Sequence, residues 1–332
     1  MGGEAQIPVF DYSLENMKLG PKVREACEVH GCFLLRCNDS EMPRLTEEMF
    51  EGMKGLFDLP DDIKRRYTSS RPFNNYMCKD LYEGIGIDDA HLVESSKAFT
   101  RVFWPQGNPE FSSALNWMSS KLLQMNLAML KVIFESYELG SYYESFAEKN
   151  TAVSRVMKYH APASGAGVRA KAHTDLNALT ILCQNDVQGL EIMSKDGVWS
   201  QVEIPQGCFV VLVGDTLKAW SNGRLHAVRH RVTISGRKDR YSCGVFTMVK
   251  EGVLVEAPKE LVDNEHPIRY KPFIYTDFMS YFVLSPGTWK TPSKSSLGFD
   301  LRRKWVIIWT GLLCSYENNG VVGSMYDQLV SY

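Results

Sequence analysis

The sequence predicts a mainly β protein with flanking helices, whose core is a β-sandwich or barrel. Helical periodicity dominates the segment from about residue 18 to 150, and short β segments separated by turn residues follow from Thr151. The chain has 332 residues, of which 44% are hydrophobic and 23% charged, as in an ordinary globular protein. Short strands that follow one another without intervening helices exclude a doubly wound α/β fold.

The N-terminal part is predicted to be mostly helical. Residues 18–31 place Leu19, Val23 and Ala26 on one helical face, because these apolar residues recur at intervals of four and three. The segment Gly31–Arg36 then has the apolar composition of a short strand. Two further helices are expected over residues 44–57, before Leu59-Pro60, and over residues 112–139, ended by Gly140.

The C-terminal part of the fold is predicted to be a succession of short strands. Turn sequences such as Lys195-Asp-Gly197 and Pro205-Gln-Gly207 separate them. Gly84-Ile-Gly86 resembles the start of a dinucleotide-binding loop. Residue 89 is Asp, however, and no strand–loop–helix unit surrounds the motif, so a dinucleotide-binding site is excluded here. The expected strands cover residues 153–160, 178–183, 189–193, 198–203, 208–213, 225–235 and 240–248.

Charge and composition exclude several classes of partner. A formal net charge of −2 gives no basic field, which duplex nucleic acid or an anionic membrane would require. The most apolar run, residues 305–314, has half of the about 20 residues needed to cross a bilayer. The N-terminus lacks a signal-peptide pattern, and the 8 cysteines form no dense framework. We expect a cytoplasmic monomer that acts on a small molecule.

His173 and Asp175 are the first candidate metal ligands. In the tripeptide His173-Thr-Asp175 the two side chains project to the same face of an extended strand, so an imidazole and a carboxylate can converge on one ion. Alone, the tripeptide is weak evidence, because it also fits a surface histidine beside a turn-forming aspartate.

A second element supplies His226 and His230, in a turn that leads into the strand expected over residues 225–235. Two histidines and one carboxylate leave one side of an ion open, which is the arrangement of non-haem Fe(II) oxygenases. His226 and His230 fall on the same face of a strand, so periodicity does not choose between them. The other histidine is then a surface residue or an outer partner of a ligand.

Arg240 and Ser242 open the last expected strand and share one face. A guanidinium binds a carboxylate through two hydrogen bonds, so the pair suits an organic acid. This assignment depends on strand register. If residues 236–239 form a four-residue hairpin loop, Arg240 points away from the metal face, so an odd turn or a bulge is required, with His230 then opposite Phe246.

With these residues identified, the chain resembles the plant 2-oxoglutarate- and Fe(II)-dependent dioxygenases over about residues 7–284. The resemblance rests on Ile7-Pro-Val-Phe-Asp11 and the ordered motifs HTDLNALTIL, GLEI, DGVW, GDTLKAWSNGR, HRV and RYS. The segments YEGIGIDDA, FTRVFWPQGNPEF and FESYELGSYY are most similar to the specialised-metabolism subgroup with AOP-like and auxin-oxidising members. The resemblance implies a double-stranded β-helix, or jelly roll, of the cupin type with N-terminal helices outside.

The resemblance also implies roles for individual residues. His173, Asp175 and His230 become the iron ligands, because His230 is the histidine followed by Arg-Val. Arg240 and Ser242 hold the distal carboxylate of the co-substrate 2-oxoglutarate. O2 is the other co-substrate and ascorbate the reductant, and no catalytic group is expected beyond the metal ligands.

Three features differ from the family pattern, and one of them is Cys37-Asn-Asp in place of the Asn-His-Gly that often follows the first strand. Tyr159-His-Ala-Pro162 replaces the usual Asn-x-Tyr before a proline, which leaves Tyr159 as the substitute contact to 2-oxoglutarate. The family's closing helix is not recognisable after residue 284. We therefore expect an N-terminal helical region over residues 1–150, a jelly-roll core over residues 151–284 and a divergent tail over residues 285–332.

The expected activity is oxidation, most simply hydroxylation, of a small specialised metabolite, with succinate and CO2 as co-products. A zinc hydrolase would use the same two histidines and carboxylate, but no HExxH motif is present and the Arg-x-Ser pair would be idle. The other alternative is a non-catalytic barrel that binds a small molecule. The complete set of three candidate metal-binding residues argues against it. An apolar, aromatic substrate pocket is expected from residues 75–77, which include Met77, and from Tyr82, Phe99 and Phe246.

Overall fold

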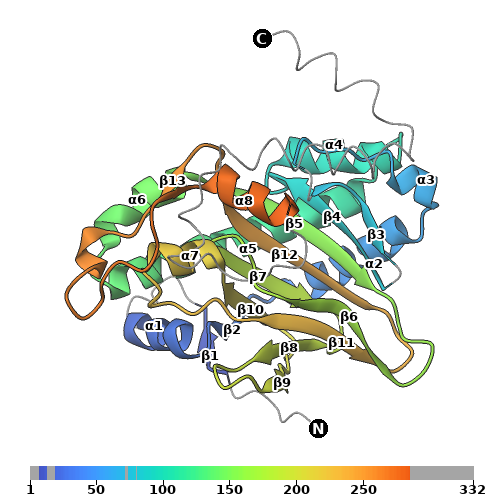
Figure 1. Cartoon of the computed structure of the whole chain (residues 1–332). Helices are drawn as coiled ribbons and strands as arrows, with labels where there is room; N and C mark the ends of the chain where they lie inside the picture. The colour runs from blue at the N-terminus through green and yellow to red at the C-terminus, as the bar shows by residue number, and fades with distance from the viewer. Residues whose placement is uncertain (1–6, 13–18, 72–73, 80, 285–332) are drawn as a thin grey trace.

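Two facing β-sheets form the centre of the computed structural model, which describes residues 7–12, 19–71, 74–79 and 81–284 (Figure 1). Successive strands of the second half of the chain are divided between the two sheets, which is the arrangement of a jelly roll. The major sheet has the order β1 (Val9–Asp11), β2 (Cys32–Arg36), β10 (Cys208–Val213), β7 (Leu179–Gln184), β12 (Arg240–Val249), β5 (Asn150–Tyr159), β4 (Tyr82–Asp88) and β3 (Met77–Lys79). The minor sheet has the order β6 (Ala166–His173), β11 (His230–Ser235), β8 (Leu190–Met193) and β9 (Trp199–Gln201).

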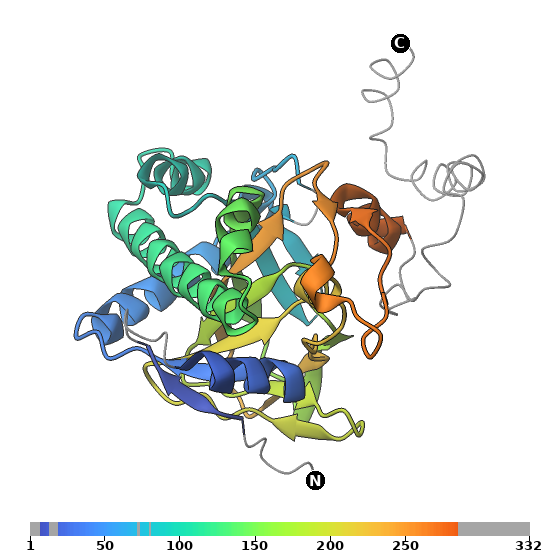
Figure 2. The same ribbon diagram turned by 90° about the vertical axis from the view of Figure 1, so that its left-hand side faces the viewer.

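Helices cover the outer face of the major sheet. The long helix α5 lies across it, with the blue helices of the N-terminal part beside it (Figure 2). Burial of one helical face against the sheet accounts for the stripe of apolar residues along this helix. The helices are α1 (Gly20–Val29), α2 (Met42–Phe57), α3 (Asp61–Lys64), α4 (Val93–Phe103), α5 (Pro109–Ser136), α6 (Gly140–Glu148), α7 (Asp215–Trp220) and α8 (Tyr275–Leu284). The smaller elements are the 3-10 helix η3 (Lys259–Leu261) and the paired strands β13 (Leu254–Val255) and β14 (Phe273–Ile274).

Local sequence explains where α5 begins and ends. Pro109 occupies its first turn, and the Asn108 side chain accepts a hydrogen bond of 3.0 Å from the backbone N–H of Phe111. The helix ends at Ser136, and Glu138 then takes a left-handed backbone with φ of 61°. The prediction that Gly140 ends this helix was wrong, since Gly140 begins α6.

Most of the expected strands are present, but three segments differ. Strands β4 and β6 were not predicted, because turn residues surround them and Gly84 and Gly86 interrupt the apolar pattern of β4. The expected strand over residues 225–235 begins only at His230, because residues 221–229 connect α7 to β11 without strand pairing. Each shift affects the predicted position of a candidate site residue.

The hairpin assumed for residues 236–239 is also wrong. Strand β11 belongs to the minor sheet, where it pairs with β6 and β8, whereas β12 pairs with β5 and β7 in the major sheet. The connection therefore crosses from one sheet to the other, and hairpin register does not decide which way Arg240 points. Phe246 lies opposite Val153 and Thr180 rather than opposite His230.

In the ranges that the structure describes, no helix combines the length and the apolarity needed to span a bilayer. The predicted tail over residues 285–332, with its apolar run over 305–314, lies outside the described residues.

Candidate metal centre and co-substrate site

Three side chains from different parts of the jelly roll converge on one point of the inner face. The ligating atoms of His173, Asp175 and His230 all lie within 4.8 Å of one another. The Nε2 atoms of both histidines are 3.8 Å from Oδ1 of Asp175. Two imidazoles and one carboxylate at these distances fit a divalent cation bound on three adjacent positions. His226 does not belong to this group, so the tertiary structure makes the choice that periodicity left open.

Backbone carbonyls fix the orientation of both imidazoles. Nδ1 of His173 is 2.8 Å from the carbonyl oxygen of Lys171, and Nδ1 of His230 is 3.2 Å from that of Val228. When Nδ1–H donates to these oxygens, each Nε2 carries the lone pair that a metal needs. The two rings are tilted at 55° with centroids 4.3 Å apart.

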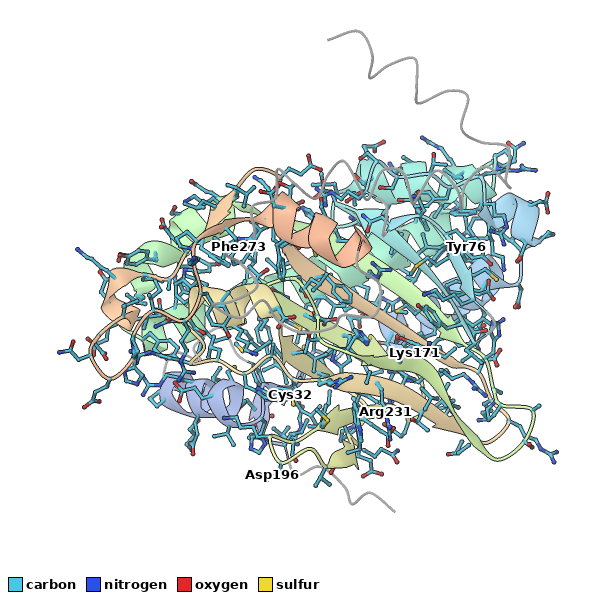
Figure 3. All side chains as sticks on the ribbon, viewed as in Figure 1. Cys32, Tyr76, Lys171, Asp196, Arg231 and Phe273 are labelled. Atoms are coloured by element: carbon cyan, nitrogen blue, oxygen red, sulfur yellow. The ribbon has the colours of Figure 1, made fainter. Side chains whose placement is uncertain are left out.

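An irregularity in β6 directs His173 inward. His230 pairs with His173, but Val232 pairs with Ala170, so β6 has one more residue than β11 between these two pairs. Without this extra residue, the alternation from the inward-facing Ala170 would place His173 on the outer face. The exposed side chain of Lys171, labelled in Figure 3, occupies the irregular stretch.

Asp175 lies just beyond the end of β6, in a loop held by neighbouring elements. Its Oδ2 accepts a hydrogen bond of 2.6 Å from the Thr180 hydroxyl, which leaves Oδ1 directed towards both histidines. Its carbonyl oxygen accepts a bond of 2.7 Å from the backbone N–H of Asp215. A Cβ at Gly214 would lie 3.1 Å from this carbonyl and 2.0 Å from that of Asn177, so only glycine allows α7 to approach the loop.

Burial keeps the His173 imidazole neutral. Desolvation lowers the pKa of His173 to about 4, and the neighbouring His230 and Arg155 lower it further, against the opposing effect of Asp175. A neutral imidazole is the form that binds a metal ion. The His173 side chain is 33% exposed, compared with 8% for His230 and 10% for Asp175, so the site is approached from the His173 side.

Arg240 is a buried cation on the same inner face. It is 1% exposed, its Nε donates to Oε1 of Gln184 at 3.0 Å, and its Cζ lies 4.9 Å from the centre of the Tyr159 ring. Its Nη1 is buried without a hydrogen-bond partner among the described residues. Desolvation lowers its pKa, opposed by Tyr159. Such a cation lacks the anion that normally accompanies a buried charge.

Register brings the predicted co-substrate residues together. Tyr159 of β5 is directly opposite Arg240 of β12, and Ser242, two residues further, faces the same side. Burial raises the pKa of Tyr159, whose phenol therefore remains a neutral hydrogen-bond donor. A carboxylate would supply the acceptor that Nη1 of Arg240 lacks, so these residues fit one end of a dicarboxylate whose other end reaches the metal centre.

The expected pocket residues are not all on the inner face. Tyr82 is there, with its ring centre 5.9 Å from that of Tyr159, and Met77 shares its face because it pairs with Gly84. Phe246 also faces inward, on the row next to Ser242 and Gly244. Phe99 lies apart from them, because it is 3% exposed within the helical core, where its ring packs 5.1 Å from Tyr67.

Three inner-face residues were missed by the sequence analysis, namely Arg155, Thr180 and Gln184. All three occupy strand positions of the same parity as a recognised residue: Arg155 alternates with Tyr159, and Gln184 and Thr180 pair with Ser242 and Phe246. Period-two alternation along the expected strands was the signal that pointed to them.

A second group of possible ligands is already occupied by a protein cation. Asp61, Cys78 and Glu83 lie close together, but Nζ of Lys64 is 3.1 Å from Asp61 and 2.5 Å from Glu83. The ammonium neutralises the carboxylates between which a metal would bind, so this cluster is a buried ion pair.

The hydroxyl of Thr180 is expected to support metal binding without contacting the metal. Thr180→Val keeps the shape but removes the hydrogen bond to Asp175, and loss of such an outer partner typically weakens metal affinity by about 10- to 100-fold. Titration of Mn(II) measures the effect. Thr247→Val is the matched control, because this buried hydroxyl bonds to Asn126 towards α5; an equal loss of affinity in both variants would contradict the role of Thr180.

Two family models match the chain. The model of the 2OG-Fe(II) oxygenase superfamily matches residues 152–249, and that of the N-terminal region of non-haem dioxygenases in morphine synthesis matches residues 7–90. A probable 2-oxoglutarate-dependent dioxygenase of Arabidopsis thaliana, AOP1.2, is 39% identical over 297 residues, which cover 85% of this chain and 92% of the relative.

Solved structures support the same comparison. The rice dioxygenase for auxin oxidation superposes with a TM-score of 0.73 at 31% identity and covers 84% of this chain and 95% of its own. The Arabidopsis thaliana dioxygenase for auxin oxidation 1, in its complex with 2-oxoglutarate, has a TM-score of 0.72 at 28% identity, with coverage of 79% and 100%. The jelly-roll fold expected from the sequence is thereby confirmed.

Proposed function

Because this chain belongs to the 2OG-Fe(II) oxygenase superfamily, as a plant AOP-like 2-oxoglutarate-dependent dioxygenase, we propose that His173, Asp175 and His230 hold its Fe(II). Members of the family are oxidoreductases that act on small metabolites, which sets aside the zinc hydrolase and the non-catalytic barrel. The observation that carries the proposal is the convergence of both Nε2 atoms on one carboxylate oxygen, each at 3.8 Å. The open side of the site leaves positions for co-substrates.

We further propose that Arg240, Ser242 and Tyr159 bind the distal carboxylate of 2-oxoglutarate. The unpaired Nη1 of Arg240 supports this role, because it is a buried donor that a carboxylate would satisfy. Gln184 holds the other side of the guanidinium through Nε, so the fork is directed before the co-substrate arrives. Preorganisation of this kind reduces the side-chain entropy lost on binding.

Bound Fe(II) and 2-oxoglutarate supply the oxidation by O2, in which 2-oxoglutarate is decarboxylated to succinate and CO2 and one oxygen atom hydroxylates the substrate. The protein residues position the reactants. Asp175 and the two histidines keep one side of the metal open, Arg240 sets the orientation of the co-substrate, and Tyr82, Met77 and Phe246 line the side from which substrate enters. Hydroxylation is the proposed outcome, and ascorbate the proposed reductant.

Cellular context and organisation follow as proposals. Seven cysteines of the described residues are free, and six of them are buried, which supports a reducing compartment such as the cytoplasm. We propose a monomer in which residues 1–150 pack on a core formed by residues 151–284.

Succinate production tests the proposed function. Purified protein incubated with Fe(II), ascorbate, O2 and 2-oxoglutarate is expected to release succinate slowly even without a second substrate, and a chelator is expected to stop it. Zn(II) in place of Fe(II) is the matched control, because it fits the same ligands but has no redox chemistry. Succinate that forms equally with Zn(II), or persists with the chelator, would contradict the proposal.

A further inference from the structure

Gln188 lies outside the co-substrate site, in the connection between β7 and β8, yet a chain of hydrogen bonds links it to Arg240. Nε of Arg240 donates to Oε1 of Gln184 at 3.0 Å, and Nε2 of Gln184 donates to Oε1 of Gln188 at 2.7 Å. Nε2 of Gln188 donates to the carbonyl oxygen of Ile204 at 3.0 Å, and Oε1 of Gln188 accepts the backbone N–H of Ile204 at 3.1 Å. The proposed chemistry uses only the first of these bonds.

The backbone of Ile204 fixes the direction of the bonds in this chain. A backbone N–H only donates and a carbonyl only accepts, so the two bonds to Ile204 allow one orientation of the Gln188 amide. Oε1 of Gln188 then faces Gln184, which presents Nε2 to it and Oε1 to Arg240. The reverse orientation of Gln184 would place amide N–H groups against a guanidinium that has only donors. Gln188 thus determines which atom of Gln184 contacts Arg240.

The same connection also encloses the rest of Arg240. The Asn185 side chain bonds to the backbone on both sides of the arginine, at 3.1 and 3.2 Å. A Cβ at Gly189 would lie 3.3 Å from Cδ of Arg240, so this residue packs on the arginine stem. Residues 184–189 therefore hold the backbone, the stem and one side of the guanidinium. Nη1 remains a buried atom without a hydrogen-bond partner in the part of the chain that the structure describes.

Both links between Arg240 and Ile204 are neutral amides. A carboxylate at position 184 would neutralise the guanidinium and compete with the co-substrate for it. The Gln184 amide instead satisfies Nε, while the positive charge stays available to an anion. Gln184 is 9% exposed, and burial strengthens the hydrogen bonds of such a network. The chain therefore orients the guanidinium without reducing its attraction for a carboxylate.

We propose that Gln188 is a positioning residue for 2-oxoglutarate, which acts through Gln184 on the direction of Arg240. The inference rests on the proposed function and adds a determinant of co-substrate affinity and length selectivity. Arg240 binds one end of the co-substrate and the metal binds the other, so a guanidinium held in one direction selects a diacid of one length. When Nε2 of Gln184 lacks its acceptor, the amide can turn and Arg240 is held less firmly.

Gln188→Met tests this role, because it removes both amide groups with little change in side-chain length. Gln188 lines a surface hollow of about 470 Å³, so the substitution disturbs no closed core. In full-length protein loaded with Mn(II), calorimetric titration is expected to give a Kd for 2-oxoglutarate raised by about 3- to 10-fold, as for the loss of one neutral hydrogen bond. The preference for 2-oxoglutarate over 2-oxoadipate, which is one methylene longer, should fall as well.

Two comparisons separate positioning from a general loss of structure. Gln201→Met is the matched control, since Gln201 lines the same hollow from β9 and is not a member of the hydrogen-bond chain. This variant should bind 2-oxoglutarate as the wild type does. The double variant of Gln184→Met and Gln188→Met should bind it no more weakly than Gln184→Met alone, because the second residue acts only through the first.

A measurement without metal or co-substrate tests the same chain independently. The buried Nε–H of Arg240 should exchange slowly with solvent, and its NMR signal is identified in protein with isotope-labelled arginine by its absence from Arg240→Met. Gln188→Met is expected to speed this exchange by about 3- to 10-fold, and Gln201→Met to leave it unchanged. A wild-type protein that does not bind 2-oxoglutarate would contradict the proposed function, whereas the exchange rate would still decide the role of Gln188.

Three results would overturn that role. The first is a Gln188→Met variant that keeps the wild-type exchange rate at Arg240, or the wild-type affinity for 2-oxoglutarate. The second is a Gln201→Met variant with the same losses as Gln188→Met. The third is a double variant whose loss of affinity is the product of the two single losses, which would show that Gln188 acts independently of Gln184.

Discussion

Asp175→Ala is expected to abolish both metal binding and succinate formation. Asp175 is the single carboxylate of the converging group, and its Oδ1 is 3.8 Å from each histidine Nε2. Removing it leaves two neutral imidazoles and no negative charge to balance a divalent cation. The loss of Mn(II) or Fe(II) affinity should exceed the about 100-fold that removal of an outer partner can cost. Metal titration of the purified variant measures affinity, and succinate release measures activity.

The variant should still fold, because Asp175 forms no ion pair with Lys or Arg among the described residues. Three hydrogen bonds that do not involve the Asp175 side chain would also remain in its loop. Those bonds join the Asp175 and Leu176 carbonyls to α7, and Thr174 to Asp215. Asp186→Ala removes a carboxylate that is 70% exposed and paired with Lys238, so it is the matched control and should behave as wild type. Stoichiometric metal in Asp175→Ala would show that the ligand is another residue.

Arg240→Met is expected to raise the KM for 2-oxoglutarate by at least about 30-fold. Removing one partner of a buried, hydrogen-bonded charge pair costs about 2–5 kcal/mol, and each 1.4 kcal/mol is a factor of ten. The Kd of 2-oxoglutarate in the Mn(II) form gives the same information without turnover. The melting temperature without 2-oxoglutarate should hold or rise, because the variant removes a cation that is 1% exposed and unpaired at Nη1.

An unchanged or higher melting temperature together with weaker binding of 2-oxoglutarate distinguishes an arginine that anchors an anion from an arginine that stabilises the fold. Arg231→Gln is the matched control, because Arg231 lies on the outer face of β11, where its Nε is 2.7 Å from Glu191 (Figure 3). That variant should bind 2-oxoglutarate as the wild type does. A variant of Arg240 that melts at a much lower temperature yet binds 2-oxoglutarate normally would contradict the assignment.

Much of the site was predictable because its chemistry is carried by short local motifs. His173 and Asp175 are two residues apart, and Arg240 and Ser242 share a face through strand alternation, so residue types and spacing alone identify them as candidates. The turn residues also placed most strands correctly.

Other features depended on contacts between distant segments. Strand parity could not choose between His226 and His230, because it does not apply to residues 221–229, which precede β11. The family resemblance favoured His230, and the tertiary structure shows the physical reason. The backbone N–H of His226 instead donates to the carbonyl of Cys27 in α1, at 2.9 Å. Phe99 was assigned to the pocket mostly through the resemblance, and the packing of helix α4 places it in the helical core.

The amino-acid sequence by itself determined the fold class, the candidate ligands and which residues of an expected strand share a face, because periodicity and turn chemistry are local. Only the tertiary structure decided which strands are partners, that β11 and β12 belong to different sheets, and that an extra residue in β6 turns His173 inward. It also placed Arg155 beside Phe246, with its Cζ 5.9 Å from the ring centre. Strand pairing is a choice among competing long-range contacts, and no pattern along one strand specifies its neighbour.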